Sequence, residues 1–244
     1  RSVTERGRKT SNREQINLDY QHKGLKLNGF AYYALDQDKR IMSTTYDIRT
    51  IDILKVRSNT NIIDRGKVFC WSGGMNYDLD KDHSIGLSYE YDSSPDFSMK
   101  GNASYFATRN NIAENRTNQN DEIKIKDGTH LINAFYLGKI KEMKIDFTSD
   151  IVVNHSRTNQ NIDDGTDIIV TSNGKDFSNL YAARLVLSHP LLTGQMRIGG
   201  DYSFISRRNW FLNEQEILPS ADNKIHESKS AGFTEYAISI GKTE

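Results

Sequence analysis

The stretch that decides the fold is residues 69–79, Phe-Cys-Trp-Ser-Gly-Gly-Met-Asn-Tyr-Asp-Leu. Its odd-numbered residues, from Phe69 to Leu79, are apolar or aromatic apart from one glycine, whereas the residues between them are small or polar. Successive side chains of a β-strand point to opposite faces, so this alternation predicts a long strand with one apolar face. A short acidic segment, Asp80–His83, follows, and the alternation resumes over Ile85–Tyr91, which indicates a hairpin.

The same alternation recurs along the chain between short turn sequences. Tight turns are predicted at Lys23–Gly24, Asp80–His83, Ile140–Glu142 and Pro190–Gly194, with a weaker signal at Gly241–Lys242. Long polar segments separate successive turns, and we expect irregular loops over Asp92–Gly128, over His155–Phe177 and from Trp210 to Ser230. About nine strands are expected, over residues 16–22, 25–33, 69–79, 85–91, 129–139, 143–154, 179–189, 195–208 and 231–240, within one domain spanning residues 1–244.

The composition excludes several classes of protein. The chain has 244 residues, 32 basic and 32 acidic, and this formal net charge of zero argues against a nucleic-acid binder. The single cysteine, Cys70, excludes an intramolecular disulfide and a thiolate zinc cluster. No apolar run is long enough for a transmembrane helix, although a strand that meets lipid needs apolar residues only at alternate positions. Because the chain lacks an initiator Met and a signal peptide, we expect a mature or truncated piece.

Motifs for catalysis and for cofactor binding are missing from the sequence. There is no P-loop, no G-x-G-x-x-G and no G-x-S-x-G, and the six histidines are scattered without ligand spacing. Asp78, Asp80 and Asp82 have the spacing that opens a calcium-binding EF-hand loop, but His83 and Tyr89 stand where glycine and glutamate are needed. We therefore expect no enzyme, no cofactor and no metal site; a barrel lipase with Ser and His on its rim is the catalytic alternative.

Tight turns that alternate with long polar segments predict an all-β fold, an antiparallel meander that forms part of a transmembrane β-barrel with short periplasmic turns and long extracellular loops. Such barrels carry aromatic girdles at both membrane interfaces. Tyr20, Tyr77 and Tyr136 precede tight turns by three or four residues, which suits the lower girdle. The alternative is that Tyr and Phe are simply good strand formers, but their recurrence at equivalent positions favours the girdle. The expected lipid-facing and girdle residues are Tyr20, Tyr33, Phe69, Trp71, Tyr77, Tyr89, Tyr91, Tyr136, Tyr202 and Phe204.

The opposite faces of the predicted strands carry charged residues in mid-strand, such as Asp19, Glu90, Lys144 and Asp150. Unpaired charges are costly to bury in a dry core, so this face must meet water or a polar partner. A wet lumen and the solvated face of a soluble sheet explain these charges equally well.

Two segments, Asn17–Gly24 and Asn76–Tyr89, resemble barrel hairpins of TonB-dependent receptor-like outer-membrane proteins. The resemblance runs along most of the chain through hairpin style, without an invariant motif. It implies a bacterial, Gram-negative outer-membrane location and contact with outer-membrane lipid. It also implies a TonB system acting through a plug domain, and a surface lipoprotein as a further partner. The plug, the TonB box and a closing strand with a terminal aromatic are not in this sequence, and nine strands are too few for a receptor-sized barrel of roughly 22 strands.

The function expected from these features is uptake of a nutrient through a larger barrel of which this chain is a fragment. The ligand, a small molecule, an oligosaccharide or a peptide, is not specified by any residue. Rings beyond the predicted lipid band offer rigid stacking surfaces, so the candidate ligand contacts are Tyr105, Phe106, Trp210 and Phe211. Two alternatives stay open: a passive porin or scaffold barrel without TonB coupling, and a soluble β-sandwich that acts as a carbohydrate-binding or adhesin module.

Overall fold

The computed structural model describes residues 2–49, 53–165 and 169–238, which form one antiparallel β-sheet and its connections. In these ranges no helix is long and apolar enough to cross a membrane. The nine strands are β1 (Ser2–His22), β2 (Leu25–Arg49), β3 (Ile53–Asp78), β4 (His83–Arg109), β5 (Ile112–Ile140), β6 (Met143–Asp163), β7 (Ile169–Leu191), β8 (Gly194–Asn213) and β9 (Ala221–Ile238).

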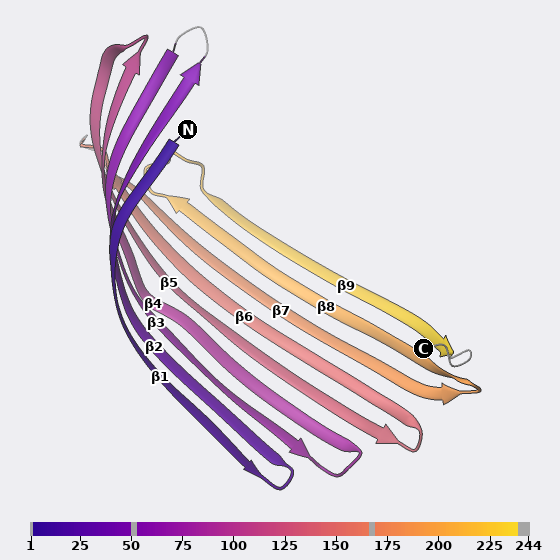
Figure 1. Cartoon of the computed structure of the whole chain (residues 1–244). Coiled ribbons are helices and arrows are strands. Elements are labelled where there is room, and N and C mark those ends of the chain that lie inside the picture. Colours follow the sequence, from indigo (N-terminus) through magenta and orange to yellow (C-terminus); the bar gives the residue numbers. More distant parts are fainter. Residues whose placement is uncertain (1, 50–52, 166–168, 239–244) are drawn as a thin grey trace, which may run out of the picture.

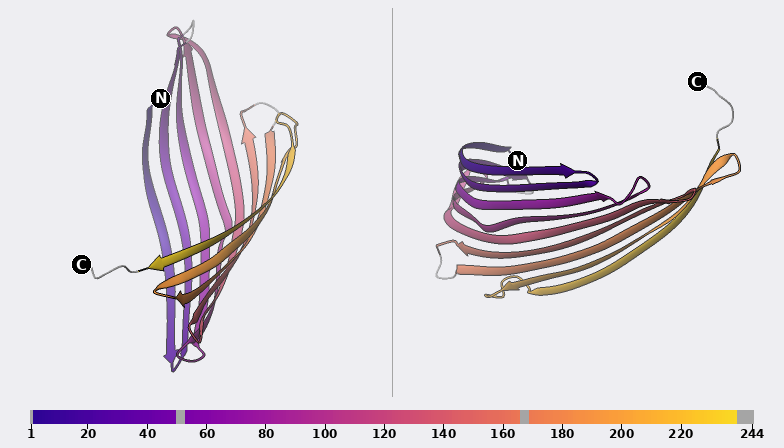
Figure 2. Two further views of the ribbon diagram at one scale, coloured as in Figure 1. Left: turned by 90° about the vertical axis from the view of Figure 1, so that its right-hand side faces the viewer. Right: turned by 90° about the horizontal axis from the view of Figure 1, so that it is seen from below.

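The strands follow one another in space in the same order as in the sequence, so the predicted all-β meander is confirmed. Each strand pairs only with the strands before and after it, and every pair is antiparallel. Figures 1 and 2 show the result as a single curved layer, like a trough, with β1 and β9 at its two borders. Those two strands do not pair with each other, so the sheet is open in the part of the chain that is described.

At the lower end of the sheet in Figure 1, tight turns connect the strands close to where the sequence predicts them. Lys23, Lys141 and Leu192 each open a two-residue turn with a positive φ of 52–57°, which is the backbone form that joins two twisted antiparallel strands. The acidic turn between β3 and β4 is held by the Asp80 carboxylate, which accepts a hydrogen bond from the Asp82 amide at 2.8 Å. The expected turn at Gly241–Lys242 lies outside the described residues.

The prediction of long irregular loops is wrong, because most of these segments form strands. Asp92–Gly128 belongs to β4 and β5, which are joined by a two-residue turn at Asn110–Asn111, and most of His155–Phe177 belongs to β6 and β7. Trp210 lies within β8, and β9 begins at Ala221, so the segment before Ala231 is also largely strand. These regions were misread because they do not alternate apolar and polar residues. A ladder of backbone hydrogen bonds does not require that alternation where both faces of a strand meet water.

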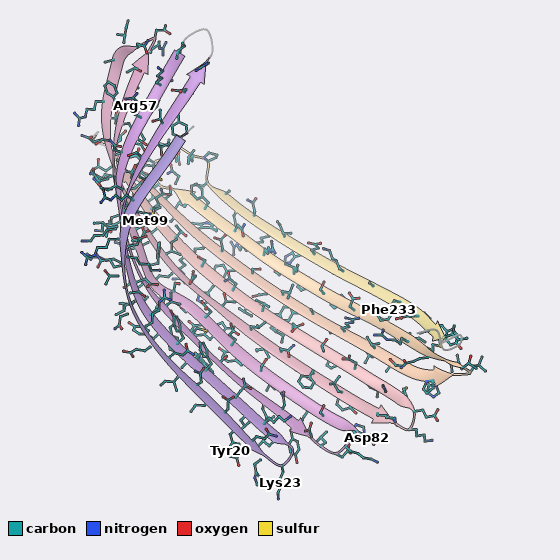
Figure 3. All side chains as sticks on the ribbon, viewed as in Figure 1. Tyr20, Lys23, Arg57, Asp82, Met99 and Phe233 are labelled. Carbon is teal, nitrogen blue, oxygen red and sulfur yellow. The ribbon has the colours of Figure 1, made fainter. Side chains whose placement is uncertain are left out.

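β1 to β5 bend sharply midway along their length, beside the labelled Met99 in Figure 3. The register of β3 and β4 shifts between Arg65 and Phe69, and that of β4 and β5 shifts between Ser94 and Phe97, around Pro95. Extra residues of this kind are β-bulges, which bend a strand and increase its twist, and a bulge is one of the few sheet positions that tolerates proline.

The sheet has two unlike faces, which β3 shows most clearly. Between Ile62 and Met75 its even-numbered residues are buried or half-buried, whereas most odd-numbered residues are exposed. Side chains crowd on the concave side of a curved sheet, so the crowded face is the concave one. Most buried side chains share this face by register: Ala34, Ile62, Ala103, Val186, Thr44, Ser58 and Asn213. Ser93, opposite Phe69, is buried on the convex face.

Candidate functional site

The convex face carries a continuous surface of apolar side chains, which we call the apolar band. Directly opposed residues of neighbouring strands point to the same face, and the register therefore groups side chains into rows. One row runs through Leu25, Tyr77, Ile85, Tyr136, Phe147 and Leu185, from β2 to β7. All ten residues predicted to face lipid, from Tyr20 to Phe204, lie on this face.

The apolar band has a nearly constant height. It covers Leu25–Tyr33 in β2, Phe69–Tyr77 in β3 and Ile145–Val153 in β6, nine residues in each strand. Nine residues of strand extend about 30 Å, and a tilted strand needs about 9–11 residues to cross the hydrocarbon core of a bilayer. Large apolar side chains within the band are open to the surroundings, with Leu18 at 67% and Leu87 at 50% exposure.

Rings border the upper edge of the apolar band, toward the upper end of the sheet in Figure 1. Phe69 lies 6.4 Å from Tyr91, Tyr91 lies 4.6 Å from His130, and His130 lies 6.3 Å from His155, measured between ring centroids. The Tyr89 hydroxyl also hydrogen-bonds Nδ1 of His130 at 2.7 Å. On β8 and β9, the ring of Phe204 stacks on that of His226, with 6.1 Å between the ring centroids. We call this set the upper belt; it comprises Tyr33, Phe69, Tyr91, His130, His155, Phe204 and His226.

The histidines of the upper belt were missed in the sequence. His130, His155 and His226 belong to β5, β6 and β9, and they are too far apart along the chain to be associated by spacing. The distance of each residue from its nearest tight turn could have associated them. His130 lies ten residues before the lower end of β5, and Phe204 lies ten residues after the lower end of β8. Residues at the same distance from the tight turns lie at the same height when the strands are tilted in parallel.

Rings also gather near the lower tight turns. Nδ1 of His83 lies 2.8 Å from the Tyr136 hydroxyl, and the rings of Tyr20 and His22 are 6.5 Å apart. In β9, the Tyr236 hydroxyl donates to the Leu191 carbonyl at 3.0 Å. Each of these tyrosines combines an apolar ring with a satisfied or exposed hydroxyl, which is the character required at a border between an apolar and a wet layer.

The concave face is polar along most of its length. Some of its charged groups are paired across strands: Arg40 contacts Asp64 at 2.7 Å, and Arg197 contacts Glu235 at 3.1 Å. At its lower end a hollow of about 800 Å³ is bordered by charged side chains of three strands and the acidic turn, among them Asp78, Asp82, Lys139, Lys144 and Asp146. A surface of this kind is stable against water and unsuited to lipid.

The four proposed ligand-contacting rings do not form one site. All four lie in strands, not in loops: Tyr105 and Phe106 are in β4, and Trp210 and Phe211 are in β8. Tyr105 and Phe211 are on the concave face, whereas Phe106 and Trp210 are on the convex face. The Trp210 ring is covered by the Lys175 ammonium, which lies 4.9 Å from the ring centroid.

Metal ligands do not come together within the ranges that the structure describes, where no group of three or more His, Cys, Asp or Glu side chains is arranged to hold an ion. The carboxylates of Asp78, Asp80 and Asp82, which have EF-hand spacing, instead belong to the acidic turn and the end of β3.

Comparison with known proteins found no matching family model and no matching curated protein. Among solved structures, the chain is similar to the ferric yersiniabactin uptake receptor FyuA from Yersinia pestis, with a TM-score of 0.47 and 11% identity over 95% of this chain and 43% of that one. It is also similar to the ferric preacinetobactin receptor BauA from Acinetobacter baumannii, with a TM-score of 0.39 and 8% identity over 97% of this chain and 44% of that one. A third similar structure is the outer membrane protease OmpT from Escherichia coli, with a TM-score of 0.31 and 9% identity over 96% of this chain and 95% of that one. The chain spans less than half the length of the two receptors.

Proposed function

We propose that this chain forms part of the wall of an outer-membrane β-barrel, with the apolar band in lipid and the concave face lining a passage for a polar solute. The apolar band carries this proposal. A monomeric soluble protein rarely exposes a contiguous apolar patch of more than a few hundred Å², and this one extends across the convex face of most of the sheet. Its constant height and bordering rings match the thickness and interfaces of a bilayer.

The soluble alternative, a β-sandwich, requires a second sheet that covers the apolar face. The described residues form one sheet, and the face that a sandwich would bury is its more exposed one. In a barrel the same arrangement is favourable, because lipid covers the convex face and water fills the concave side.

Closure of the barrel needs further strands. An open edge in lipid leaves backbone N–H and C=O groups without partners, at a cost of several kcal/mol for each group. The free edges of β1 and β9 are therefore proposed to pair with strands of the same protein that are not among those described. The resemblance to TonB-dependent receptors implies a barrel of roughly 22 strands.

The finer function that we propose is uptake of a nutrient in the manner of a TonB-dependent receptor. A plug domain coupled to the TonB system would close the passage, and a surface lipoprotein is a further proposed partner. The ligand is proposed to be a small molecule, an oligosaccharide or a peptide. Of the candidate rings, Tyr105 and Phe211 are the proposed ligand contacts, because both lie on the concave face.

The membrane placement can be tested with spin labels on β4. In a Cys70→Ser background, single cysteines are introduced at each position from Ser84 to Tyr91, labelled, and measured after reconstitution into phospholipid vesicles. Collisions with oxygen, which dissolves in lipid, should peak at Ile85, Leu87 and Tyr89. Collisions with a water-soluble nickel chelate should peak at the positions between them, because they face the passage. High accessibility to the nickel chelate at Ile85, Leu87 and Tyr89 as well as at the positions between them would contradict the proposal. Low accessibility to both reagents at all of these positions would favour a sandwich.

A further inference from the structure

Three cationic side chains form a row on the convex face, above the upper belt. Lys126 of β5 lies directly opposite Arg157 of β6, and Arg157 lies directly opposite Lys175 of β7. With Lys124 and the amides of Asn159 and Asn173, they border a shallow groove of about 270 Å³. We call Lys126, Arg157 and Lys175 the cation row.

The cation row has no anionic partner in the chain as described. Like charges directly opposed on neighbouring strands destabilise a sheet, yet within the described ranges no carboxylate lies at ion-pair distance from these three residues. The neighbouring cations differ. Lys124 lies 3.2 Å and Lys100 3.3 Å from Glu122, and hydrogen bonds from Lys124 and then Lys100 hold the pKa of Glu122 below its usual range.

The height of the cation row matches the headgroup layer of a membrane. Arg157 lies two residues beyond His155 of the upper belt, and Lys126 lies four residues beyond His130. These separations correspond to about 7–13 Å along the strands, and strand tilt reduces them. The headgroup layer adds about 5–8 Å beyond the hydrocarbon core on each side. Long Lys and Arg side chains can reach down to this depth while their backbone stays above it.

From these observations we propose that the cation row binds the phosphate groups of a phosphorylated glycolipid in the outer leaflet. The inference rests on the proposed membrane placement. The Arg157 guanidinium can hold a phosphate through two parallel hydrogen bonds, and the two lysines supply further positive charge. The amides of Asn159 and Asn173, 2.7 Å apart, border the same groove and offer partners for sugar hydroxyls. Within the row, Lys175 already contacts the Trp210 ring, and the lipid phosphates would balance the repulsion that this contact leaves between the three cations.

The test compares Arg157→Gln and Lys126→Gln with Lys100→Gln in the full-length protein, reconstituted in phosphatidylcholine nanodiscs. Lys100→Gln removes the same charge from the same face, but its ammonium already faces Glu122. Binding of diphosphoryl lipid A is titrated, with inorganic phosphate as a competitor. We expect each row substitution to weaken lipid A binding by about tenfold or more. The control should change it less than about twofold, and millimolar phosphate should compete poorly.

A second measurement separates binding from a merely structural role. Without lipid A, removing one cation relieves repulsion, so Arg157→Gln and Lys126→Gln should not lower the urea midpoint, whereas with lipid A they should lower it relative to wild type. Equal binding by all variants, or a lipid-independent loss of stability, would overturn the lipid site while leaving the membrane placement intact. If inorganic phosphate displaced lipid A as effectively as lipid A itself does, the cation row would be a simple anion site and the proposed lipid site would be wrong. Failure of the wild type to enter nanodiscs would overturn both proposals.

Discussion

Two glycines on neighbouring strands show how single positions shape this sheet. A methyl group at Gly86 would enter the space of the Phe135 ring, which covers the Gly86 backbone from the next strand. At Gly73, a methyl group would meet nothing closer than the Asn28 carbonyl at 4.0 Å. An aromatic ring over a glycine fills the missing side-chain volume and permits local coiling of the sheet, so Gly86 has a packing role that Gly73 lacks.

We predict that Gly86→Ala destabilises the folded protein by about 1–3 kcal/mol, because the Phe135 ring must shift. Gly73→Ala should be neutral or slightly stabilising. Urea midpoints of the protein folded in lipid vesicles measure both. In a double-mutant cycle, Gly86→Ala with Phe135→Ala should cost less than the sum of the single changes. Equal effects at the two glycines would show that the ring contact is unimportant.

Adjacent residues of β3 should respond oppositely to a charge. Met75 lies in the apolar band and Asn76 on the concave face. Met75→Arg should destabilise the protein in a bilayer by about 1–3 kcal/mol, because Met75 lies between mid-depth and the lower border of the band, and the cost of a cation on a lipid-facing strand falls toward the interface. Asn76→Arg, whose side chain meets water, should change stability by less than about 1 kcal/mol. Folding yield and urea midpoints in vesicles test the pair, and a larger effect at Asn76 would reverse the assignment of the two faces.

The longest strands of the sheet are longer than a strand needs to be to cross a membrane. β5 has 29 residues and β4 has 27, whereas about 9–11 residues cross the hydrocarbon core. The remainder therefore projects above the upper belt as a sheet that is polar on its convex side. Cross-strand amide and hydroxyl pairs hold this part, such as Ser104 with Asn118 at 2.8 Å and Ser43 with Asn59 at 2.7 Å.

The tip of the β4–β5 hairpin depends on Asn110 and Asn111, which have φ of 51° and 68°. Two consecutive positive φ values are characteristic of a type I′ turn, which favours Asn and Gly. Asn111→Gly should be neutral, whereas Asn111→Val should destabilise the tip by about 1–3 kcal/mol because a β-branched residue is strained there. Hydrogen exchange of the upper parts of β4 and β5 should rise only in the valine variant. Identical exchange in both would indicate another turn geometry.

The molecule as a whole consists of one curved layer, and its convex face has no protein partner in the described part of the chain. We predict that the intact protein requires detergent for extraction and aggregates when detergent is diluted below its micellar concentration, because the apolar band then meets water. Size-exclusion chromatography with light scattering measures this. Monodisperse protein in plain buffer would contradict the membrane placement.

The sequence by itself determined the strands that have one apolar and one polar face. Phe69–Leu79 and Ile85–Tyr91 could be recognised because contact with two different environments imposes a period of two on the residues. The tight turn at Lys23–Gly24 followed from the same pattern, and the predicted lipid-facing Tyr136 shares its face with Ile85 in the observed register. The two strand segments within Asp92–Gly128 could not be recognised, because their residues do not alternate apolar and polar side chains. The backbone ladder and cross-strand polar pairs such as Ser104 with Asn118 hold them.

Only the tertiary structure decided which residues meet across strands. The upper belt joins Tyr91, His130 and His155, and the cation row joins Lys126, Arg157 and Lys175, each from different strands. Their association depends on the register between strands, including the bulge near Pro95, which exchanges the residues on the two faces of β4 above that point. A shift of one residue reverses the faces of a whole strand. For this reason the alternation of residues predicts the existence of an apolar face, whereas the composition of a site on that face is set by the pairing of the strands.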